Sequence, residues 1–379
     1  MSKSKFSHVR IAGITGVVPE KCINIDDEIQ FYGGDEKLLK RNKSILGLGT
    51  RHVIDDRTTM CDLCQLAAER LLQELQVDRE SIDALVVVST SHDYYYPASS
   101  CVLHGRLGLA DRCTCFDMAG LACSGYVHGL NVVHSMVESG MARRCLLLVG
   151  DISSVHSDRR NRNVNMLFGD AGTATLVEYT AAETQSWFVT GTRGAGWEAI
   201  IAPAGGFDIP VRNDIANVEL VDGAGNVWHL WEDIMKGMDV FRFTTDVGPQ
   251  GIRDVLELSG KKMEEIDYFA FHQANKQIVR TVASYAEIPR EKFSTDTFTK
   301  YANCSTASVA TDICNTLHDR NPGCVCLVTF GVGLSWGHAV VDFSQTKICD
   351  IGLYKTPGAA KSREEKIAHW INSFKQGNK

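Results

Sequence analysis

The sequence predicts an α/β protein in which buried strands alternate with helices in two similar halves. Runs of consecutive apolar residues, such as 145–150 and 324–330, are typical of strands that are covered on both faces. Amphipathic helices separate these runs, and the same alternation recurs in the second part of the chain. With 379 residues, the chain is long enough for two domains or for one duplicated domain.

The first half is predicted to span residues 1–182. Its expected elements are a helix over about 59–76, strands over 82–90 and 115–118, a helix over about 124–139, and strands over 145–150 and 175–178. Residues 168–174 form a glycine-containing turn before the last of these strands. In the first helix, the small and apolar residues recur at helical spacing and therefore lie on one face.

The second half is predicted to span residues 183–345 and to repeat this plan. Its expected elements are helices over about 237–259, 275–286 and 304–318, a strand before residue 272, and strands over 324–330 and 338–343. Layered α/β folds usually place ligands where such units meet, so we expect both halves to contribute to one site.

Composition excludes several classes of function. The net charge of −7 provides no basic field for nucleic acid. No apolar run approaches the roughly 20 residues that a membrane-spanning helix needs. The first residues lack the apolar segment of a secretory signal, so we expect a cytoplasmic protein.

The thirteen cysteines do not have the spacing of a metal site. Cys61 and Cys64 form a CxxC pair inside a predicted helix, but no second pair follows at zinc-ribbon distance. An odd number of cysteines in a long chain without a signal peptide favours reduced thiols. Most of them are therefore expected to be small buried side chains, and no metal is predicted.

Three residues stand apart as candidates for covalent catalysis. Cys123 lies in the sequence LACSG, His272 lies in FHQAN after a predicted strand, and Asn303 lies in YANCSTAS. A thiol nucleophile requires an imidazole nearby, and an amide can donate a hydrogen bond without adding charge. Cys123 is expected at the start of a helix, whose positive dipole end predicts a lowered thiol pKa.

Each of the three residues also has a purely structural interpretation. Cys123 is one of many small side chains that a core can bury, and His272 at a strand end can be a satisfied structural histidine. Asn303 is well suited to cap the helix that follows it. We reject these interpretations together because all three would have to hold at once in a matching order.

These motifs, together with FGVGLSWG at residues 330–337, resemble those of the β-ketoacyl-(acyl-carrier-protein) synthase III family of the thiolase superfamily. The resemblance runs from about residue 8 to about residue 345. It implies a duplicated five-layer αβαβα fold and a homodimer. Asn303 at the third position indicates the type III branch, because elongating synthases carry a second histidine there.

The resemblance implies an acyltransferase with a defined reaction. Cys123 would become acylated, and His272 and Asn303 would polarise a malonyl thioester while CO2 leaves. The backbone N–H groups of Cys123 and Val332 would form an oxyanion hole. The substrates would be thioesters of CoA or of an acyl carrier protein in fatty acid or polyketide biosynthesis, with no further cofactor.

Substrate-contacting residues follow from the same resemblance. Those implied are Tyr96, Arg162, Met235, Gly237, Phe241, Lys276, Gly331 and Gly333. Tyr96 would close the acyl pocket of the partner in the dimer, and Lys276 would stand in for a carrier-docking arginine. Arg162 matches the arginine that stacks on the CoA adenine, whereas Arg41 and Ile45 occupy the other two positions of that clamp.

Two other functions remain open at this point. The same scaffold could transfer the acyl group to an alcohol or amine without decarboxylation, with His272 as general base. Alternatively, the chain could be a non-catalytic partner subunit of a synthase complex, which the presence of all three catalytic candidates disfavours.

Residues 346–379 form an extension beyond the expected end of the fold. Ser362 and Glu365 have the spacing of a capping box, and Ile367, Trp370, Ile371 and Phe374 follow at helical spacing. We expect this helix to pack its apolar stripe on its own body or on a dimer mate. The alternative is a docking helix for a partner or an acidic carrier protein.

Overall fold

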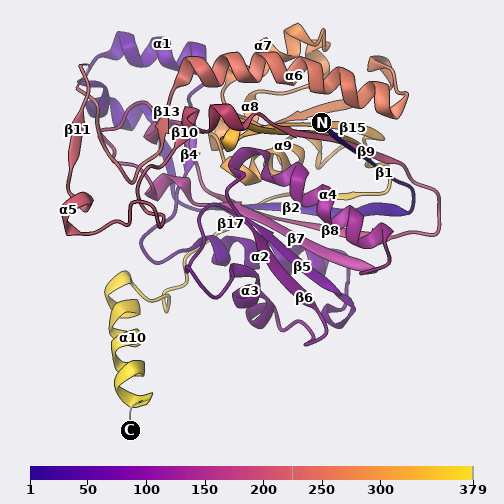
Figure 1. Cartoon of the computed structure of the whole chain (residues 1–379), viewed down its shortest axis with the longest axis horizontal. Helices are drawn as coiled ribbons and strands as arrows, with labels where there is room; N and C mark the ends of the chain where they lie inside the picture. The colour runs from indigo at the N-terminus through magenta and orange to yellow at the C-terminus, as the bar shows by residue number, and fades with distance from the viewer. Residues whose placement is uncertain (224, 378–379) are drawn as a thin grey trace.

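Two β-sheets stacked between three helical layers form the body of the protein (Figure 1). The computed structural model describes residues 1–223 and 225–377, and the side chain of Phe374 lies outside the described part. The first sheet contains, in order, β17 (Lys347–Tyr354), β2 (Val9–Pro19), β8 (Ala171–Tyr179), β7 (Arg144–Asp151), β5 (Ala84–Val88) and β6 (Thr114–Met118). The second contains β1 (Ser2–Phe6), β9 (Ser186–Thr192), β16 (Ser335–Asp342), β15 (Cys324–Gly331) and β14 (Tyr268–Phe271).

The helices cover every face of these sheets. Helices α2 (Met60–Glu74) and α3 (Ser99–Leu107) lie on the outer face of the first sheet. Helices α4 (Gly125–Glu138) and α9 (Ser308–Leu317) lie between the two sheets. Helices α6 (Gly237–Ser259) and α7 (Lys276–Tyr285) lie on the outer face of the second sheet. Three separate apolar cores fill the spaces between the layers. The predicted duplicated αβαβα architecture is therefore confirmed.

Shorter elements surround one end of the sheets. They are α1 (Glu36–Leu46), α5 (Asn213–Ala216), α8 (Asp296–Tyr301), and the strand pairs β3 (Cys22–Asn24) with β4 (Thr50–His52), β10 (Ile200–Ile201) with β13 (Ile234–Met235), and β11 (Glu219–Val221) with β12 (Val227–His229).

The predicted elements are present, and two strands are longer than expected. β8 already begins at Ala171, inside the expected turn, because it pairs antiparallel with β7 from Asp151 onward. β16 begins at Ser335, where it pairs with Thr192 of β9. Both added segments are rich in glycine, alanine and hydroxyl residues, which give no apolar signal and form strands through tertiary pairing.

The two halves exchange strands at the ends of the chain. β1, from the first half, pairs with β9 in the second sheet. β17, from the predicted extension, pairs in parallel with β2 and completes the first sheet. The predicted boundaries at residues 182 and 345 remain predictions; strands from both sides of residue 182 enter each sheet, and β17, beyond residue 345, enters the first sheet.

The predicted C-terminal helix is present as α10 (Arg363–Gly377) and stands off the body (Figure 1). Ser362 Oγ accepts a hydrogen bond from Glu365 N at 3.3 Å, and Ser362 N donates to Glu365 Oε2 at 2.7 Å, as the capping box predicts. Of the two expected packing partners, its own body is wrong, because Ile367, Trp370 and Ile371 are exposed in the single chain, and packing on a dimer mate stays a prediction.

Two expectations about composition can be compared with the described residues. Cys61 and Cys64 are buried in α2 as predicted, and Cys64 Sγ lies 3.5 Å from Met60 Sδ. Across residues 1–223 and 225–377, no helix combines the length and apolar character needed to cross a bilayer.

Candidate active site

Cys123 lies between β6 and α4, in a single 3₁₀ turn over residues 122–124. Ala122, directly before it, has φ +41°, a left-handed conformation that costs an L-residue with a side chain about 1 kcal/mol. This turn presents the sulfur at the start of α4. Cys123 Sγ donates to Ser305 Oγ at 3.9 Å.

The loop after β15 packs directly against the cysteine turn. A Cβ atom at Gly331 would lie 2.7 Å from Ser124 N and closer still to Leu121 O, so only glycine fits there. Ser124 Oγ and Ser335 Oγ, 2.6 Å apart, hold the two segments together. Val332 follows Gly331, which brings its backbone to the side of the nucleophile. Gly333 has φ +102° and reverses the chain.

His272 is held at the end of β14 by its backbone and is surrounded by the core. His272 N donates to Val328 O of the neighbouring strand at 2.7 Å, and the next residue, Gln273, donates from its N–H to Ser308 Oγ at 2.8 Å. Burial lowers the pKa of His272 to about 3, so the imidazole is neutral at every working pH. Its Nδ1 is buried and makes no hydrogen bond within the described residues.

Asn303 has a fixed side chain whose nitrogen is free to face a ligand. Its Oδ1 accepts from Ser305 N at 2.8 Å, and its backbone bonds to Leu167 O and Gly169 N. The Oδ1 bond is a local contact two residues along the chain; Asn303 does not cap the helix that follows, because the cap positions are Cys304 for the 305–307 turn and Ala307 for α9. Because that oxygen is occupied by an N–H donor, the amide is oriented with Nδ2 as the remaining donor.

Ser305 and Asp151 are site residues that the sequence reasoning missed. Asp151 ends β7 and is fully buried; its Oδ1 accepts from Ser89 Oγ, Thr90 N, Thr90 Oγ1 and Ser91 Oγ at 2.7–3.2 Å. Its Oδ2 accepts from Thr306 N at 3.1 Å and Thr306 Oγ1 at 2.7 Å. Asp151 therefore joins the first sheet to the segment that carries Asn303 and Ser305. No motif marks it, because its partners lie far apart in the chain.

The predicted lowering of the Cys123 pKa is wrong. Burial raises the pKa of this thiol to about 12; the hydrogen bond to Ser305 opposes the rise, and the carboxylates of Asp151 and Asp233 add to it. The position at a helix start was read correctly, but desolvation outweighs it. Both pKa shifts favour the neutral thiol and the neutral imidazole of His272 over a thiolate–imidazolium pair.

We expect the alkylation of Cys123 by iodoacetamide to rise about tenfold per pH unit from pH 7 to pH 10 without levelling off. The thiolate is the reacting form, and its fraction grows tenfold per unit while pH stays below the pKa. Peptide mass spectrometry measures the rate, and unmodified Cys326, which is fully buried, shows that the fold persists. An alkylation rate that reaches a plateau below pH 9 would show that the thiol pKa is lowered, as the sequence predicted.

The segment that contains Met235, Gly237 and Phe241 borders the same region. Met235 ends β13, which pairs with β10, and β10 contacts the 332–334 turn. Gly237 is the first residue of α6, and Phe241 lies one turn further along. Asp233, two residues before Met235, acts electrostatically on Cys123 and lies 3.8 Å from His156, so this side of the thiol is polar.

The remaining predicted contact residues lie further out. Arg162 Nε donates to Asn226 Oδ1 at 2.8 Å, so the guanidinium is tied to the β11–β12 hairpin. Lys276 begins α7, packs its stem on Gly47 and donates from Nζ to Ser44 O at 3.3 Å. Tyr96 is 85% exposed, next to the cis peptide before Pro97.

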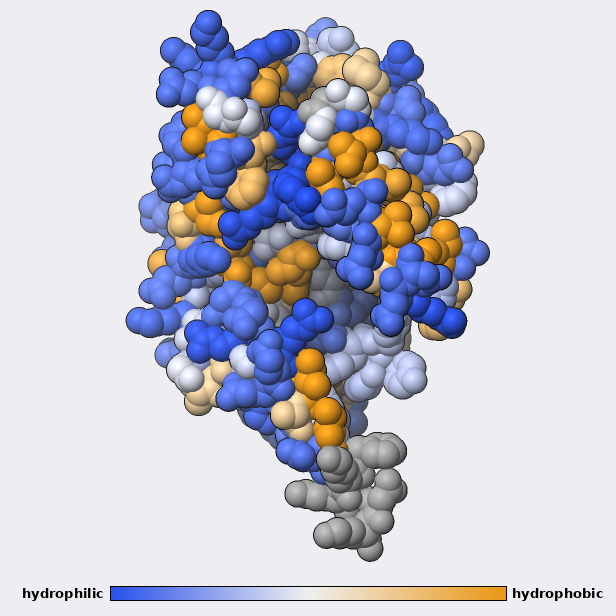
Figure 2. Space-filling view, turned by 90° about the vertical axis from the view of Figure 1, so that its left-hand side faces the viewer, coloured by the Kyte–Doolittle hydropathy of each residue, from blue (hydrophilic) through white to orange (hydrophobic). Residues whose placement is uncertain are grey.

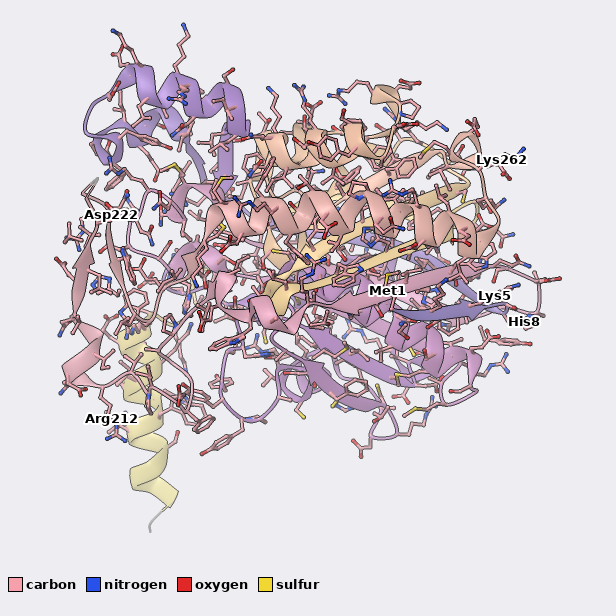
Figure 3. The ribbon with its side chains drawn as sticks, turned by 45° about the horizontal axis from the view of Figure 1, so that its top comes forward. Met1, Lys5, His8, Arg212, Asp222 and Lys262 are labelled. Atoms are coloured by element: carbon pink, nitrogen blue, oxygen red, sulfur yellow. The ribbon has the colours of Figure 1, made fainter. Side chains whose placement is uncertain are left out.

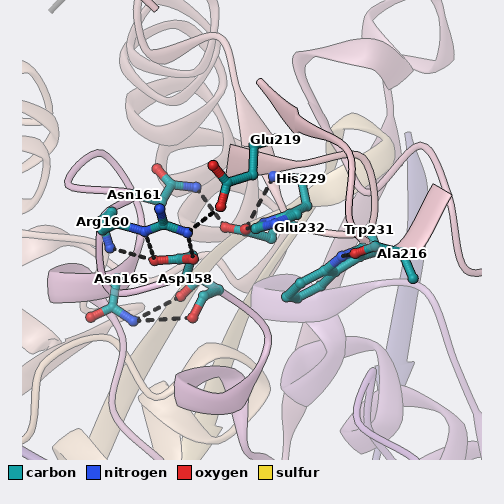
Figure 4. Close-up of polar contacts among 10 residues, drawn as sticks. Asp158, Arg160, Asn161, Asn165, Ala216, Glu219, His229, Trp231 and Glu232 are labelled. Carbon is teal, nitrogen blue, oxygen red and sulfur yellow. Dashed lines mark hydrogen bonds and ion pairs between the residues drawn. The ribbon is translucent and has the colours of Figure 1, made fainter. Parts of the chain in front are cut away.

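A buried polar network fastens the β11–β12 hairpin to the loop after β7 (Figure 4). Glu232 Oε1 accepts from His229 Nδ1 at 2.7 Å, and Glu232 Oε2 accepts from Asn161 Nδ2 at 3.0 Å. On the surface, Arg160 bridges Asp158 and Glu219, each at 2.7 Å. These contacts fix the hairpin beside Arg162, on the side of the site where Asp233 lies.

The fold has two stacked sheets, and its candidate site combines a cysteine at a helix start with a histidine and an asparagine from the second half. This combination is typical of a thiolase-fold acyltransferase. Comparison with known families specifies the class further. Residues 116–194 match the family model for 3-oxoacyl-[acyl-carrier-protein (ACP)] synthase III, and residues 256–343 match the model for its C-terminal part. The chain belongs to the 3-oxoacyl-[acyl-carrier-protein] synthase III family.

Individual relatives cover nearly the whole chain. A putative 3-oxoacyl-[acyl-carrier-protein] synthase 3 from Campylobacter jejuni is 35% identical over 353 residues, which are 93% of this chain and 99% of the relative. A β-ketoacyl-[acyl-carrier-protein] synthase III from Fusobacterium nucleatum is 28% identical over 89% of this chain and 99% of its own length. The crystal structure of a 3-oxoacyl-(acyl-carrier protein) synthase from Burkholderia xenovorans superposes with a TM-score of 0.85 at 31% identity, covering 93% of this chain and 99% of that one.

Proposed function

We propose that this protein forms an acyl-enzyme on Cys123 and condenses the acyl group with a malonyl thioester, with loss of CO2. The observation that supports this most is the convergence of four segments on one place. The cysteine turn contacts β15, the 305–307 turn and the 332–334 turn, and Gln273 of the histidine motif bonds to Ser308.

The first half-reaction transfers an acyl group to the thiol. The sulfur of Cys123 attacks the thioester carbonyl of the donor as the thiol gives up its proton, and the leaving thiolate takes up that proton. The backbone N–H groups of Cys123 and Val332 are the proposed oxyanion hole for the tetrahedral intermediate. Close packing of Gly331 on the Leu121–Ser124 segment supports this pairing.

The second half-reaction uses His272 and Asn303 as neutral donors. Loss of CO2 from the malonyl group leaves its electron pair on the α-carbon and negative charge on the thioester oxygen. Neutral imidazole and the Asn303 Nδ2 group can hydrogen-bond that oxygen without protonating it. The carbanion then attacks the acyl carbonyl on Cys123, and the sulfur leaves as the new C–C bond forms.

The proposed substrates are thioesters of CoA or of an acyl carrier protein, with no additional cofactor, in fatty acid or polyketide biosynthesis. Met235, Gly237, Phe241, Gly331 and Gly333 are proposed to border the acyl and pantetheine passage. Lys276 and Arg162 are proposed to contact the carrier or the nucleotide.

A homodimer is proposed as the working form. β6 is an edge strand of the first sheet, and it directly precedes the cysteine turn. Tyr96, exposed on the single chain, is proposed to enter the acyl pocket of the second copy. Unpaired edges and exposed aromatic side chains are features that association covers.

Intact-mass spectrometry after incubation with a panel of acyl-CoA and acyl-carrier thioesters tests this function. The panel includes a hydroxyacyl donor, because Asp233 and His156 make one side of the thiol polar. The expected result is one adduct, located on Cys123, followed by release of labelled CO2 from a malonyl donor. Acyl transfer to an alcohol or amine without CO2 would contradict condensation, and no adduct with any donor would indicate a non-catalytic partner subunit.

A further inference from the structure

Helix α10 projects from the body with almost no contacts of its own (Figures 1 and 2). From Arg363 to Ser373 every side chain is exposed except Lys366, which is half-buried and donates from Nζ to Arg57 O at 3.0 Å. A 15-residue helix is marginal in water without tertiary packing. The helix therefore lacks the surface that would stabilise it.

Two pairs of exposed aromatic side chains lie beside the apolar stripe of α10, one that includes Trp370 of the helix and one on the body. Trp370 is 59% exposed and contacts the ring of Tyr94, with ring centroids 6.4 Å apart. Tyr95, 80% exposed, contacts Phe207, which is 91% exposed, at a centroid distance of 6.0 Å. We define the aromatic strip as Ile367, Trp370, Ile371, Tyr94, Tyr95 and Phe207. Monomeric proteins rarely expose large apolar patches, and Trp, Tyr and Phe are enriched at the centres of interfaces.

Charge indicates what covers this strip. Residues 345–379 contain seven Lys and Arg and three Asp and Glu, a net charge of +4. The whole chain carries −7, so residues 1–344 carry −11 (32 basic against 43 acidic residues). Of the +4 in residues 345–379, α10 itself carries +1 (three basic and two acidic residues), and the rest lies in the residues on either side of it. The C-terminal segment and the acidic body have opposite signs and attract each other between copies. Asp208, exposed beside Phe207, brings part of that acidic charge to the strip.

We propose that α10 is an arm that docks on a second copy of this chain, where Ile367, Trp370 and Ile371 cover Tyr95 and Phe207 of the second copy. A twofold axis makes the contact reciprocal, because each copy carries both the arm and the surface that receives it. Figures 1 and 3 both show α10 on the side of the molecule that carries α5 and β11. The inference does not depend on the reaction proposed for Cys123.

Photo-crosslinking between isotopically distinct copies tests the contact. p-Benzoylphenylalanine replaces Ala368, which is exposed beside the stripe, in full-length chains mixed as equal parts ordinary and ¹⁵N-labelled protein. The expected crosslinked peptides join a light and a heavy chain and include residues 93–97 or 205–209. Crosslinks confined to one chain, or absent at concentrations where the protein is dimeric, would overturn the proposal.

Sedimentation equilibrium supplies the second measurement. The double substitution Trp370→Ala/Ile371→Ala is expected to weaken dimerisation at least about tenfold, since interface aromatic residues commonly exceed that effect. Asn372→Ala/Ser373→Ala, on the polar side of the same helix, is the matched control and should leave the dissociation constant unchanged.

The same variants distinguish a second copy of this chain from other partners that could bind α10. If the dissociation constant is unchanged while Trp370→Ala/Ile371→Ala abolishes binding to phosphatidylglycerol vesicles or to an acidic acyl carrier protein, the arm serves that partner and the proposal is wrong. Absence of an adduct on Cys123 would overturn the proposed function and would leave both measurements on α10 unaffected.

Discussion

Replacement of Cys123 with alanine is expected to abolish the acyl-enzyme and to slow condensation by about 10⁴-fold or more, the usual consequence of removing a covalent nucleophile. Release of CO2 from a malonyl thioester should persist, uncoupled from acyl transfer, because His272 and Asn303 are untouched. Intact-mass spectrometry detects the adduct, and release of radiolabelled CO2 from a labelled malonyl donor measures decarboxylation. Cys101→Ala, at an exposed cysteine, is the control and should behave like the unsubstituted protein.

The converse variants make this prediction sharper. His272→Ala and Asn303→Asp should still become acylated on Cys123 but should lose CO2 release. Asp at position 303 can keep the acceptor for Ser305 N, which lies 2.8 Å from the present Oδ1, while it replaces the proposed donor with an acceptor and adds a buried negative charge. If Cys123→Ala and Asn303→Asp lose the two half-reactions in the same proportion, the division of roles proposed here is wrong.

Local sequence patterns were sufficient to predict most of the fold. Buried strands such as β5 and β7 are continuous apolar runs, and the helix over about 237–259 has the observed bounds of α6. Four strands of the two sheets were not predicted, namely β1, β2, β9 and β17, and β17 pairs with β2 across more than 300 positions of the chain. Such pairing is a tertiary effect that local propensity does not contain.

The site was predictable to the extent that single residues carry chemistry. Cys123, His272 and Asn303 have side chains whose reactivity suggests a role, and the structure places their segments together. The direction of the Cys123 pKa could not be predicted, because it depends on how deeply the thiol is desolvated and on Asp151 and Asp233, which lie far from it in sequence. Ser305 and Asp151 were missed for the same reason, since their importance lies entirely in their partners.

Asp151 provides the second large effect, on stability and on the geometry of the site. Asp151→Ala leaves six donor groups from four residues without their acceptor, among them the backbone N–H groups of Thr90 and Thr306, which cannot rotate away. Loss of buried partners on this scale is expected to cost about 3–5 kcal/mol in the free energy of unfolding. For a chain of this length, that corresponds to a fall in Tm of about 5 °C.

Asp151→Asn tests the same network without removing volume. In either orientation of the amide, its NH₂ group faces one of the two fixed backbone N–H groups, so one end of the network opens while the other persists. Acyl-enzyme formation should fall where the NH₂ group faces Thr306, because Thr306 then no longer anchors the segment in which Ser305 contacts Cys123.

In Asp151→Asn, the rate of Cys123 alkylation by iodoacetamide should rise while acyl-enzyme formation falls. The Asp151 carboxylate helps to raise the pKa of the thiol, so its removal lowers that pKa and increases the thiolate fraction at a fixed pH. Asp111→Asn, at an exposed aspartate, is the matched control for both rates. Faster alkylation reports the loss of the nearby carboxylate, and slower acylation reports the displacement of the segment that Thr306 anchors. If both reactions slow together, Asp151 acts only on the stability of the fold.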